Sequence, residues 1–257
     1  MKHLKKIVLL LAVVSLIFNV SCSKDDGDDV TTDLSELEFV FDQSNPPVDQ
    51  TIISNLSSSG DANATQIASQ LSIANLMTLY LGFFEETQGS IKTNTPIGTC
   101  GGDAVVYTYT ASDGVESFTV AYQICETSDK YTFQVLTSQN GVDFNLLIYA
   151  EESKADLREG LMNIYAGDPT DVEAGSEIII AYTWKENSDG SFDYTASNDD
   201  AGFLLSIKIN ADNSGTLSYR LDGVLFYEAT WNSTGTAGTY TNYDSEGNEV
   251  ASGNWPG

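Results

Sequence analysis

The feature that most constrains the fold is a series of short runs of alternating side chains that begins near residue 103. Seven of these runs read SFTVAYQI, KYTFQVLTS, NLLIYA, SEIIIAYTW, GFLLSIKI, GTLSYRL and VLFYEATW. They are rich in β-branched and aromatic residues, recur about every 10–13 residues, and are separated by turn clusters such as NSDG, NADNSG and SEGN. No helix-length block alternates with them. We therefore predict a mainly β fold, an antiparallel meander that forms a barrel or a sandwich, and not a parallel α/β sheet.

One segment before these runs has the periodicity of a helix. Residues 61–86 begin with a cap from Asp61 or Asn63, and their apolar side chains leave little polar surface. These apolar residues are Ile67, Leu71, Ala74 and Leu81, widened by Ile73, Leu76, Met77, Tyr80 and Phe84. The pattern predicts one buried N-terminal helix, with docking on a partner as the alternative. A weaker alternation at residues 34–41 predicts a short strand.

The clearest hairpin lies on either side of Asp113-Gly114. An Asp-Gly pair between two alternating runs is typical of a two-residue turn. Centring the turn on this pair predicts a register with Tyr109 opposite Phe118, Tyr107 opposite Val120, Val105 opposite Tyr122 and Gly102 opposite Cys125.

This register places Cys100 and Cys125 on one face of the hairpin as diagonal neighbours. A bulge at Gly101-Gly102 would close the remaining gap, so we predict a structural disulfide. The third cysteine, Cys22, is expected to have another role, described below. The other two are then an even pair, which is typical of an exported protein. A metal site with two thiolates and two free thiols are the alternatives.

A loose repeat runs through the second half of the chain. Residues 160–165, 190–194, 215–219 and 238–243 each begin with glycine and reach a tyrosine, and YTW or ATW precedes two of them. The pattern is that of a degenerate hairpin repeat, although Gly in turns and Tyr in strands would produce it without a repeat. It also favours a strand over a helix for residues 160–165.

The first 30 residues have the pattern of an export signal. Lys2, Lys5 and Lys6 precede an apolar block over residues 7–18, which is shorter than the roughly 20 residues of a membrane-spanning helix. Cys22 and the acidic stretch SKDDGDDV follow. This segment resembles a bacterial lipoprotein precursor, and CSKDDGDD resembles the acidic tag that sends Bacteroidota lipoproteins to the cell surface. Asn19 stands where that family usually has a branched apolar residue.

The resemblance implies cleavage before Cys22, lipidation of Cys22, and an outer-membrane lipoprotein exposed at the cell surface. Attachment to the membrane would then need only the lipid chains. The alternative is an ordinary cleaved signal with an incidental cysteine. We divide the chain into a signal peptide (1–21), a lipidated cysteine with an acidic linker (22–33), and a single helix-plus-antiparallel-β domain (34–257).

The charge of the chain excludes nucleic acid as a partner. The formal net charge is −26, and removal of residues 1–21 leaves 8 basic against 37 acidic residues, a net charge of −29. Such a protein is repelled by nucleic acid and by anionic lipid. The acids are scattered, so solubility explains them better than cation binding.

The residues of several reaction types are missing from the predicted mature chain. The only histidine of the full sequence, His3, lies in the predicted signal peptide, which removes Ser-His-Asp and Cys-His catalysis and histidine-ligated metals from the mature chain. No phosphate-binding glycine motif occurs. A carboxylate glycoside hydrolase is compatible with the composition, although adjacent acids such as Glu85-Glu86, Glu151-Glu152 and Asp199-Asp200 point apart in strands.

Two turn segments make calcium possible as a cofactor, although they lack the full calcium-loop pattern: NSDGS (187–191) and NADNSG (210–215).

Aromatic residues are the remaining candidates for binding. Trp184 shares a strand face with Tyr182, and Trp231 shares one with Tyr227. Near strand ends such rings bind sugars or line the mouth of a barrel. The sequence reveals no specific activity. We predict a non-enzymatic envelope or surface protein that binds a glycan, an apolar ligand or a protein partner, with the glycoside hydrolase as the alternative.

Overall fold

A computed structural model of the chain describes residues 46–81, 90–98, 100–112, 114–155, 159–166 and 177–255. Cys22, the predicted signal peptide, the acidic linker and the predicted strand at 34–41 lie outside these residues. Within the described ranges, no helix has both the length and the apolar character needed to cross a membrane.

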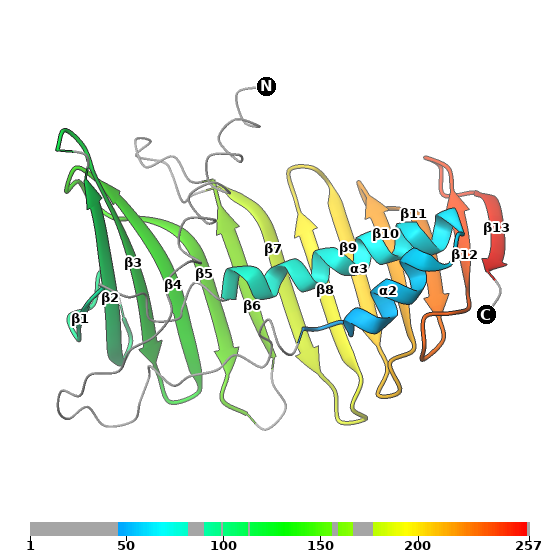
Figure 1. Cartoon of the computed structure of the whole chain (residues 1–257), viewed down its shortest axis with the longest axis horizontal. Coiled ribbons are helices and arrows are strands. Elements are labelled where there is room, and N and C mark those ends of the chain that lie inside the picture. Colours follow the sequence, from blue (N-terminus) through cyan, green and yellow to red (C-terminus); the bar gives the residue numbers. More distant parts are fainter. Residues whose placement is uncertain are drawn as a thin grey trace.

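Thirteen strands form one antiparallel sheet in which strands adjacent in the chain are neighbours in space (Figure 1). They are β1 (Ile91–Thr93), β2 (Asp103–Ser112), β3 (Ser117–Glu126), β4 (Lys130–Gln139), β5 (Asn145–Ser153), β6 (Glu159–Tyr165), β7 (Ile178–Glu186), β8 (Phe192–Asn198), β9 (Phe203–Ile209), β10 (Gly215–Leu221), β11 (Val224–Trp231), β12 (Gly238–Tyr243) and β13 (Glu249–Trp255). The predicted antiparallel meander is confirmed, as is the strand predicted at residues 160–165. Among the described residues, β1 and β13 are the two edges of an open sheet.

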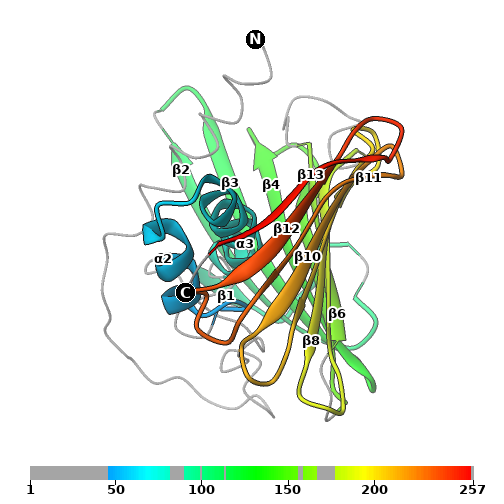
Figure 2. The same cartoon turned by 90° about the vertical axis from the view of Figure 1, so that its right-hand side faces the viewer.

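Two helices, α2 (Gln50–Ser58) and α3 (Ala62–Leu81), cover one face of this sheet. Figure 1 shows α3 crossing the strands, and Figure 2 shows that the sheet curves around it. The Oδ1 atom of Asp61 caps α3 by accepting hydrogen bonds from the N–H groups of Asn63 (2.8 Å) and Ala64 (3.1 Å). The predicted buried helix is therefore confirmed, although residues 82–86 of that prediction lie outside the described part.

Helix α2 was not predicted from the sequence. It has only nine residues, too few to display a clear period, yet Ile52, Ile53 and Leu56 are buried. Its neighbours hold it in place: the side-chain amide of Asn75 on α3 bonds both backbone groups of Val48, at 2.9 and 2.8 Å. The α2–α3 hairpin thus covers the sheet as one unit.

The core lies between these helices and the inner, helix-facing side of the sheet. Strand residues alternate between this side and the outer side, so every second residue enters the core. The largest fully buried side chains are Trp255, Tyr107, Tyr182, Tyr194, Tyr227, Phe133, Leu56, Ile67, Leu71, Ile148 and Met162. The large aromatic side chains of the sheet are therefore used mainly for packing against the helices.

Four bulges account for the curvature of the sheet. In β5, β7, β11 and β13 one residue is skipped in the pairing with the preceding strand: Leu147, Ile179, Phe226 and Val250. A bulge places two residues opposite one, which bends the strand and increases its twist. All four lie near the start of their strands, and hence at the same end of the meander.

The predicted register of the β2–β3 hairpin is wrong by two residues. Tyr109 lies opposite Val120, Tyr107 opposite Tyr122, and Val105 opposite Ile124. The reason is that Ser112 pairs with Ser117, so that four residues of the chain, and not two, separate the paired ends of the strands. Ser112 closes this loop, because its hydroxyl donates to the carbonyl of Glu116 (2.9 Å) and accepts from the N–H of Gly114 (3.1 Å).

The predicted disulfide between Cys100 and Cys125 is present, with 5.9 Å between the two Cα atoms. Cys125 lies opposite Ala104 rather than Gly102, and Cys100 precedes β2. Gly102 allows this path, because a Cβ there would lie 1.9 Å from the carbonyl oxygen of Glu126.

The outer face of β2–β4 is also covered. Val106, Ala121 and Leu136 form a small buried cluster under Ile97, Phe144 and Leu146. The buried amide of Gln123 fixes this cover by accepting from the N–H of Ile97 (2.6 Å) and donating to its carbonyl (3.2 Å). No such cluster of buried apolar residues covers the outer face of β8–β12 in the described residues.

Three tryptophans lie over glycines of the neighbouring strand. Trp184 is opposite Gly160, Trp231 is opposite Gly215, and Trp255 is opposite Gly238. A Cβ on these glycines would lie 2.3, 2.2 and 2.3 Å from a ring carbon of the tryptophan. The glycines that open three of the four repeat units therefore make room for an indole ring.

We expect Gly215→Ala to lower the free energy of unfolding by about 1–3 kcal/mol, the usual cost of overpacking a core. The added methyl would meet both the Trp231 ring and the carbonyl of Lys208, at 2.5 Å. Gly101→Ala is the matched control, since its Cβ would lie 3.5 Å from Thr127. Urea denaturation measures both, and equal midpoints for the two variants would contradict the packing argument.

We expect the Cys100–Cys125 disulfide to contribute about 3.5 kcal/mol, the chain-entropy value for a loop of this length. Non-reducing peptide mapping should find the two cysteine peptides linked. Reduction should shift the denaturation midpoint of the wild type but not that of a Cys100→Ser/Cys125→Ser variant. Complete alkylation without reductant would refute the bridge.

Candidate functional site

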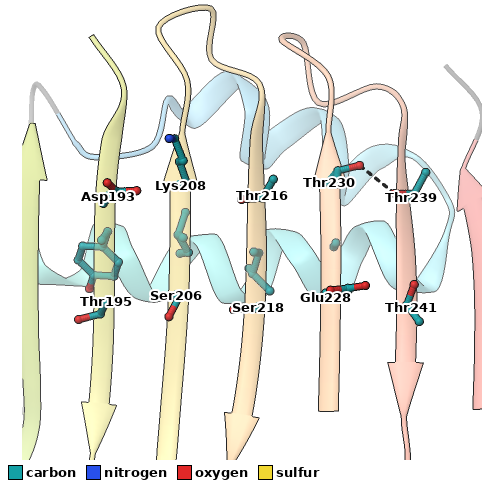
Figure 3. A pocket seen from close by; sticks show the side chains of 14 residues that line it. Asp193, Thr195, Ser206, Lys208, Thr216, Ser218, Glu228, Thr230, Thr239 and Thr241 are labelled. Atoms are coloured by element: carbon teal, nitrogen blue, oxygen red, sulfur yellow. Dashed lines mark hydrogen bonds between the residues drawn. The ribbon is translucent and has the colours of Figure 1, made fainter. Parts of the chain in front are cut away.

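A depression of about 400 Å³ lies on the outer face of β8–β12, away from α2 and α3 (Figure 3). Ten polar side chains from five neighbouring strands line it: Asp193, Thr195, Ser206, Lys208, Thr216, Ser218, Glu228, Thr230, Thr239 and Thr241. We call these ten residues the polar face. Seven of them carry hydroxyl groups.

The strand register arranges the polar face in two rows that run across the strands. The first row is Thr195, Ser206, Ser218, Glu228 and Thr241, and the second is Asp193, Lys208, Thr216, Thr230 and Thr239. Members of one row lie directly opposite each other on adjacent strands, about 4.8 Å apart. The two rows are two residues apart along each strand, on the same side of the sheet.

Hydrogen bonds orient part of the polar face. The hydroxyl groups of Thr230 and Thr239 bond to each other at 2.9 Å, as Figure 3 shows. Asn187 donates to Asp193 (2.7 Å), and the phenol of Tyr243 donates to Glu228 (2.6 Å), which raises the pKa of Tyr243. Both carboxylates are thereby held by neutral donors.

Other members of the polar face keep their hydrogen-bonding capacity. The side chains of Ser206, Lys208, Thr216 and Ser218 make no hydrogen bond or ion pair with any residue in the part of the chain that the structure describes. They lie in the middle of the two rows. The centre of the depression therefore offers three hydroxyl groups and one ammonium group to a ligand.

The two carboxylates of the polar face are poorly placed for glycoside hydrolysis. Asp193 lies on β8 and Glu228 on β11, which are three strand spacings or about 14 Å apart. Glycosidases hold their two carboxyl groups about 5–10 Å apart. This pair is therefore too widely separated to act as the two carboxylates of a glycosidase.

The two predicted calcium loops lie side by side at one end of the sheet. They line a second, open depression of about 350 Å³ formed by Asp189, Ser191, Asn210, Ala211, Asp212 and Ser214. Hydrogen bonds from Ser191 and Ser214 lower the pKa values of Asp189 and Asp212 respectively. Among the described residues no three His, Cys, Asp or Glu side chains gather as metal ligands, so calcium binding stays a prediction.

The four aromatic residues predicted to bind a ligand lie in the core. Tyr182 is 1% exposed, Trp184 and Tyr227 are 2% exposed, and Trp231 is 3% exposed. Trp231 donates its indole N–H to the carbonyl of Asn213 (3.0 Å). None of these rings presents a face to solvent, so the polar face, and not these rings, is the candidate surface.

The adjacent acids Glu151 and Glu152 point to opposite sides of the sheet, as predicted for a strand. Glu152 is buried, whereas Glu151 is half-buried and bonds Lys130 (2.6 Å) and Tyr149 (2.7 Å). Burial works to raise the pKa of Glu151, but these two hydrogen bonds and the positive charge of Lys130 together outweigh it and lower the pKa. Glu151 is therefore held as a carboxylate. Asp199-Asp200 lie in the turn after β8, and Glu85-Glu86 lie outside the described residues.

The sequence does contain a pattern that indicates the polar face, but the residues predicted from the sequence to bind a ligand are aromatic ones instead. Between the buried residues of β8–β12, the alternate positions are small and polar, as in DYTAS, SIK, GTLS, EATW and GTYT. Which of these positions share a row depends on the register across five strands.

No protein-family model matches the chain, and no curated protein matches its sequence.

Proposed function

We propose that the chain is a lipid-anchored, non-enzymatic surface protein that binds a neutral glycan on the polar face. The observation that carries this proposal is the gathering of seven hydroxyl groups, two carboxylates and one ammonium group in one shallow depression. Ser206, Thr216, Ser218 and Lys208 at its centre leave their polar atoms available to a ligand.

The chemistry of these groups suits sugars. A serine or threonine hydroxyl both donates and accepts hydrogen bonds, a carboxylate accepts, and an ammonium group donates. A sugar ring presents hydroxyl groups that do both, so it pairs with a mixed surface of this kind. Each such bond contributes about 0.5–1.5 kcal/mol net, so useful affinity requires several of them together.

The charge of the protein favours a neutral ligand. With a net charge of −29 predicted for the mature chain, an anionic polymer is repelled before it reaches the surface. Lys208 is the only cation on the polar face, against Asp193 and Glu228. A neutral glycan avoids this repulsion and still accepts a hydrogen bond from Lys208.

The remaining parts of the proposal come from the N-terminal sequence. Cys22 is the proposed site of lipidation, and the acidic stretch behind it supports export to the outer surface of the outer membrane. A tethered domain that captures a glycan needs no catalytic group. Protein partners and apolar ligands are less suited to a depression lined by hydroxyl groups.

We expect the purified mature protein to bind at least one neutral polysaccharide on a glycan array without turning it over. Ser218→Leu, at the centre of the polar face, should abolish binding, because it removes a hydroxyl and fills the depression. Thr110→Leu is the control, because Thr110 is an exposed strand residue in a Thr–Thr pair with Thr119 (2.8 Å) on β2–β3. Equal loss in both variants, or cleavage of the ligand, would contradict the proposal.

We expect Cys22→Ser to release the protein from the membrane into the soluble fraction, because the lipid chains are its proposed anchor. Fractionation followed by immunoblotting measures this, and metabolic labelling with a fatty acid should mark the wild type alone. Ser21→Ala is a suitable control, since it leaves the cysteine in place. A Cys22→Ser variant that still sediments with membranes would disprove the anchor.

A further inference from the structure

The two rows of the polar face continue beyond the depression. On β13, Ser252 lies opposite Thr241 and Asn254 lies opposite Thr239, and both are exposed. In the described residues β13 is the edge of the sheet, so no described strand pairs with it on the far side of these two residues. The rows therefore run from β8 to β13 and reach the sheet edge.

The opposite end of the rows has a different character. On β7 the second row reaches Lys185, which forms an ion pair with Glu159 on β6 (2.7 Å). The first row reaches Thr183, whose hydroxyl is bonded to Thr195 at 2.6 Å, and then Leu161 on β6. Long side chains thus replace the small polar ones from β7 onward in the second row and from β6 onward in the first row.

Larger side chains also follow the first row on its other side. Two residues further along the strands, the same face carries Leu204, Arg220, Leu225 and Tyr243 on β9 to β12, whereas β8 has the small residue Ser197 there. Tyr243 is fixed by its hydrogen bond to Glu228. The small residues of the two rows therefore form a strip bordered along one side by bulkier ones.

We propose that this strip is a groove for a linear glycan, which binds with its chain axis across the strands and through its internal units. The inference rests on the glycan binding proposed above and specifies the form of the ligand. The strip covers six strands, or five spacings of about 4.8 Å, and is thus about 24 Å long. A ligand confined to one sugar ring would use only a small part of it.

The repeat of the strip supports a polymer. At every strand from β8 to β13 the same two positions present a polar or charged side chain, and ten of these twelve side chains are Ser, Thr, Asn or Asp, Lys208 and Glu228 being the exceptions. A polymer of identical units meets such a surface with similar polar contacts at each step. Weak single contacts then add up along one molecule.

The test measures affinity against the length of the ligand. The full mature protein is titrated calorimetrically with a series of oligosaccharides, from two to eight units, of the polysaccharide that the array identifies. We expect affinity to rise by about tenfold or more between the shortest and longest members and then to level off, because each further unit adds hydrogen bonds. The monosaccharide should not compete.

A variant at the end of the strip separates this inference from binding itself. Ser252→Leu should weaken binding of the longest oligosaccharide while leaving that of the shortest unchanged, because it alters the strip only at β13. Thr110→Leu should change neither. Thermal melting of each variant verifies that the exposed substitution leaves the fold intact.

The outcomes are distinct. An affinity that rises with ligand length, together with a loss of affinity for only the longest oligosaccharide in Ser252→Leu, supports the groove. Binding that is independent of length, or inhibited by the monosaccharide, overturns the groove but leaves glycan binding intact. No binding by any neutral glycan overturns both.

Discussion

The structure depends on covering the apolar face of one very wide sheet. In the described residues, thirteen strands in chain order create an inner surface of aromatic and aliphatic side chains. Exposure of this surface to water would be unfavourable in free energy. The meander supplies no second sheet to cover this surface among the described residues. Helix α3 lies along it, with Ala64, Ala68 and Ala74 allowing a close approach, and α2 extends the cover. Four bulges bend the strands so that the sheet follows the helix.

This arrangement gives the two sides of the sheet different roles. Tryptophan and tyrosine side chains that were candidates for ligand binding are needed inside, where three indole rings fill the space above glycines. On the outer side, an apolar cluster anchored by Gln123 covers β2–β4. The outer side of β8–β12 has no such cover in the described residues, and polar side chains line its depression. A ligand that binds on this side of the sheet would therefore contact mainly polar side chains.

The same division explains what the sequence could predict. Alternation and turn clusters are local signals, so they predicted most of the strands, although not β1 or β13, together with the antiparallel order and the helix capped by Asp61. The predicted hairpin register is wrong because Ser112 pairs with Ser117, which leaves four residues between the strands, and the local sequence does not distinguish this connection from a two-residue turn. Alternation in the sequence showed which residues share a strand face with Trp184 and Trp231. It did not show that the helices would cover that face. The polar face needed the register of five strands at once.

Small hydroxyl residues on the polar face call for an explanation beyond solubility. Threonine favours strands, but serine does not, so Ser206 and Ser218 at the centre are not accounted for by strand propensity. Charged residues keep a sheet surface soluble, and the chain has 37 acids, of which only Asp193 and Glu228 lie among these ten positions. Longer charged side chains there would fill the depression. Eight of the ten side chains are short, Lys208 and Glu228 being the exceptions, and this preserves a surface that a ligand can enter. That is the physical basis for the binding proposed on this face.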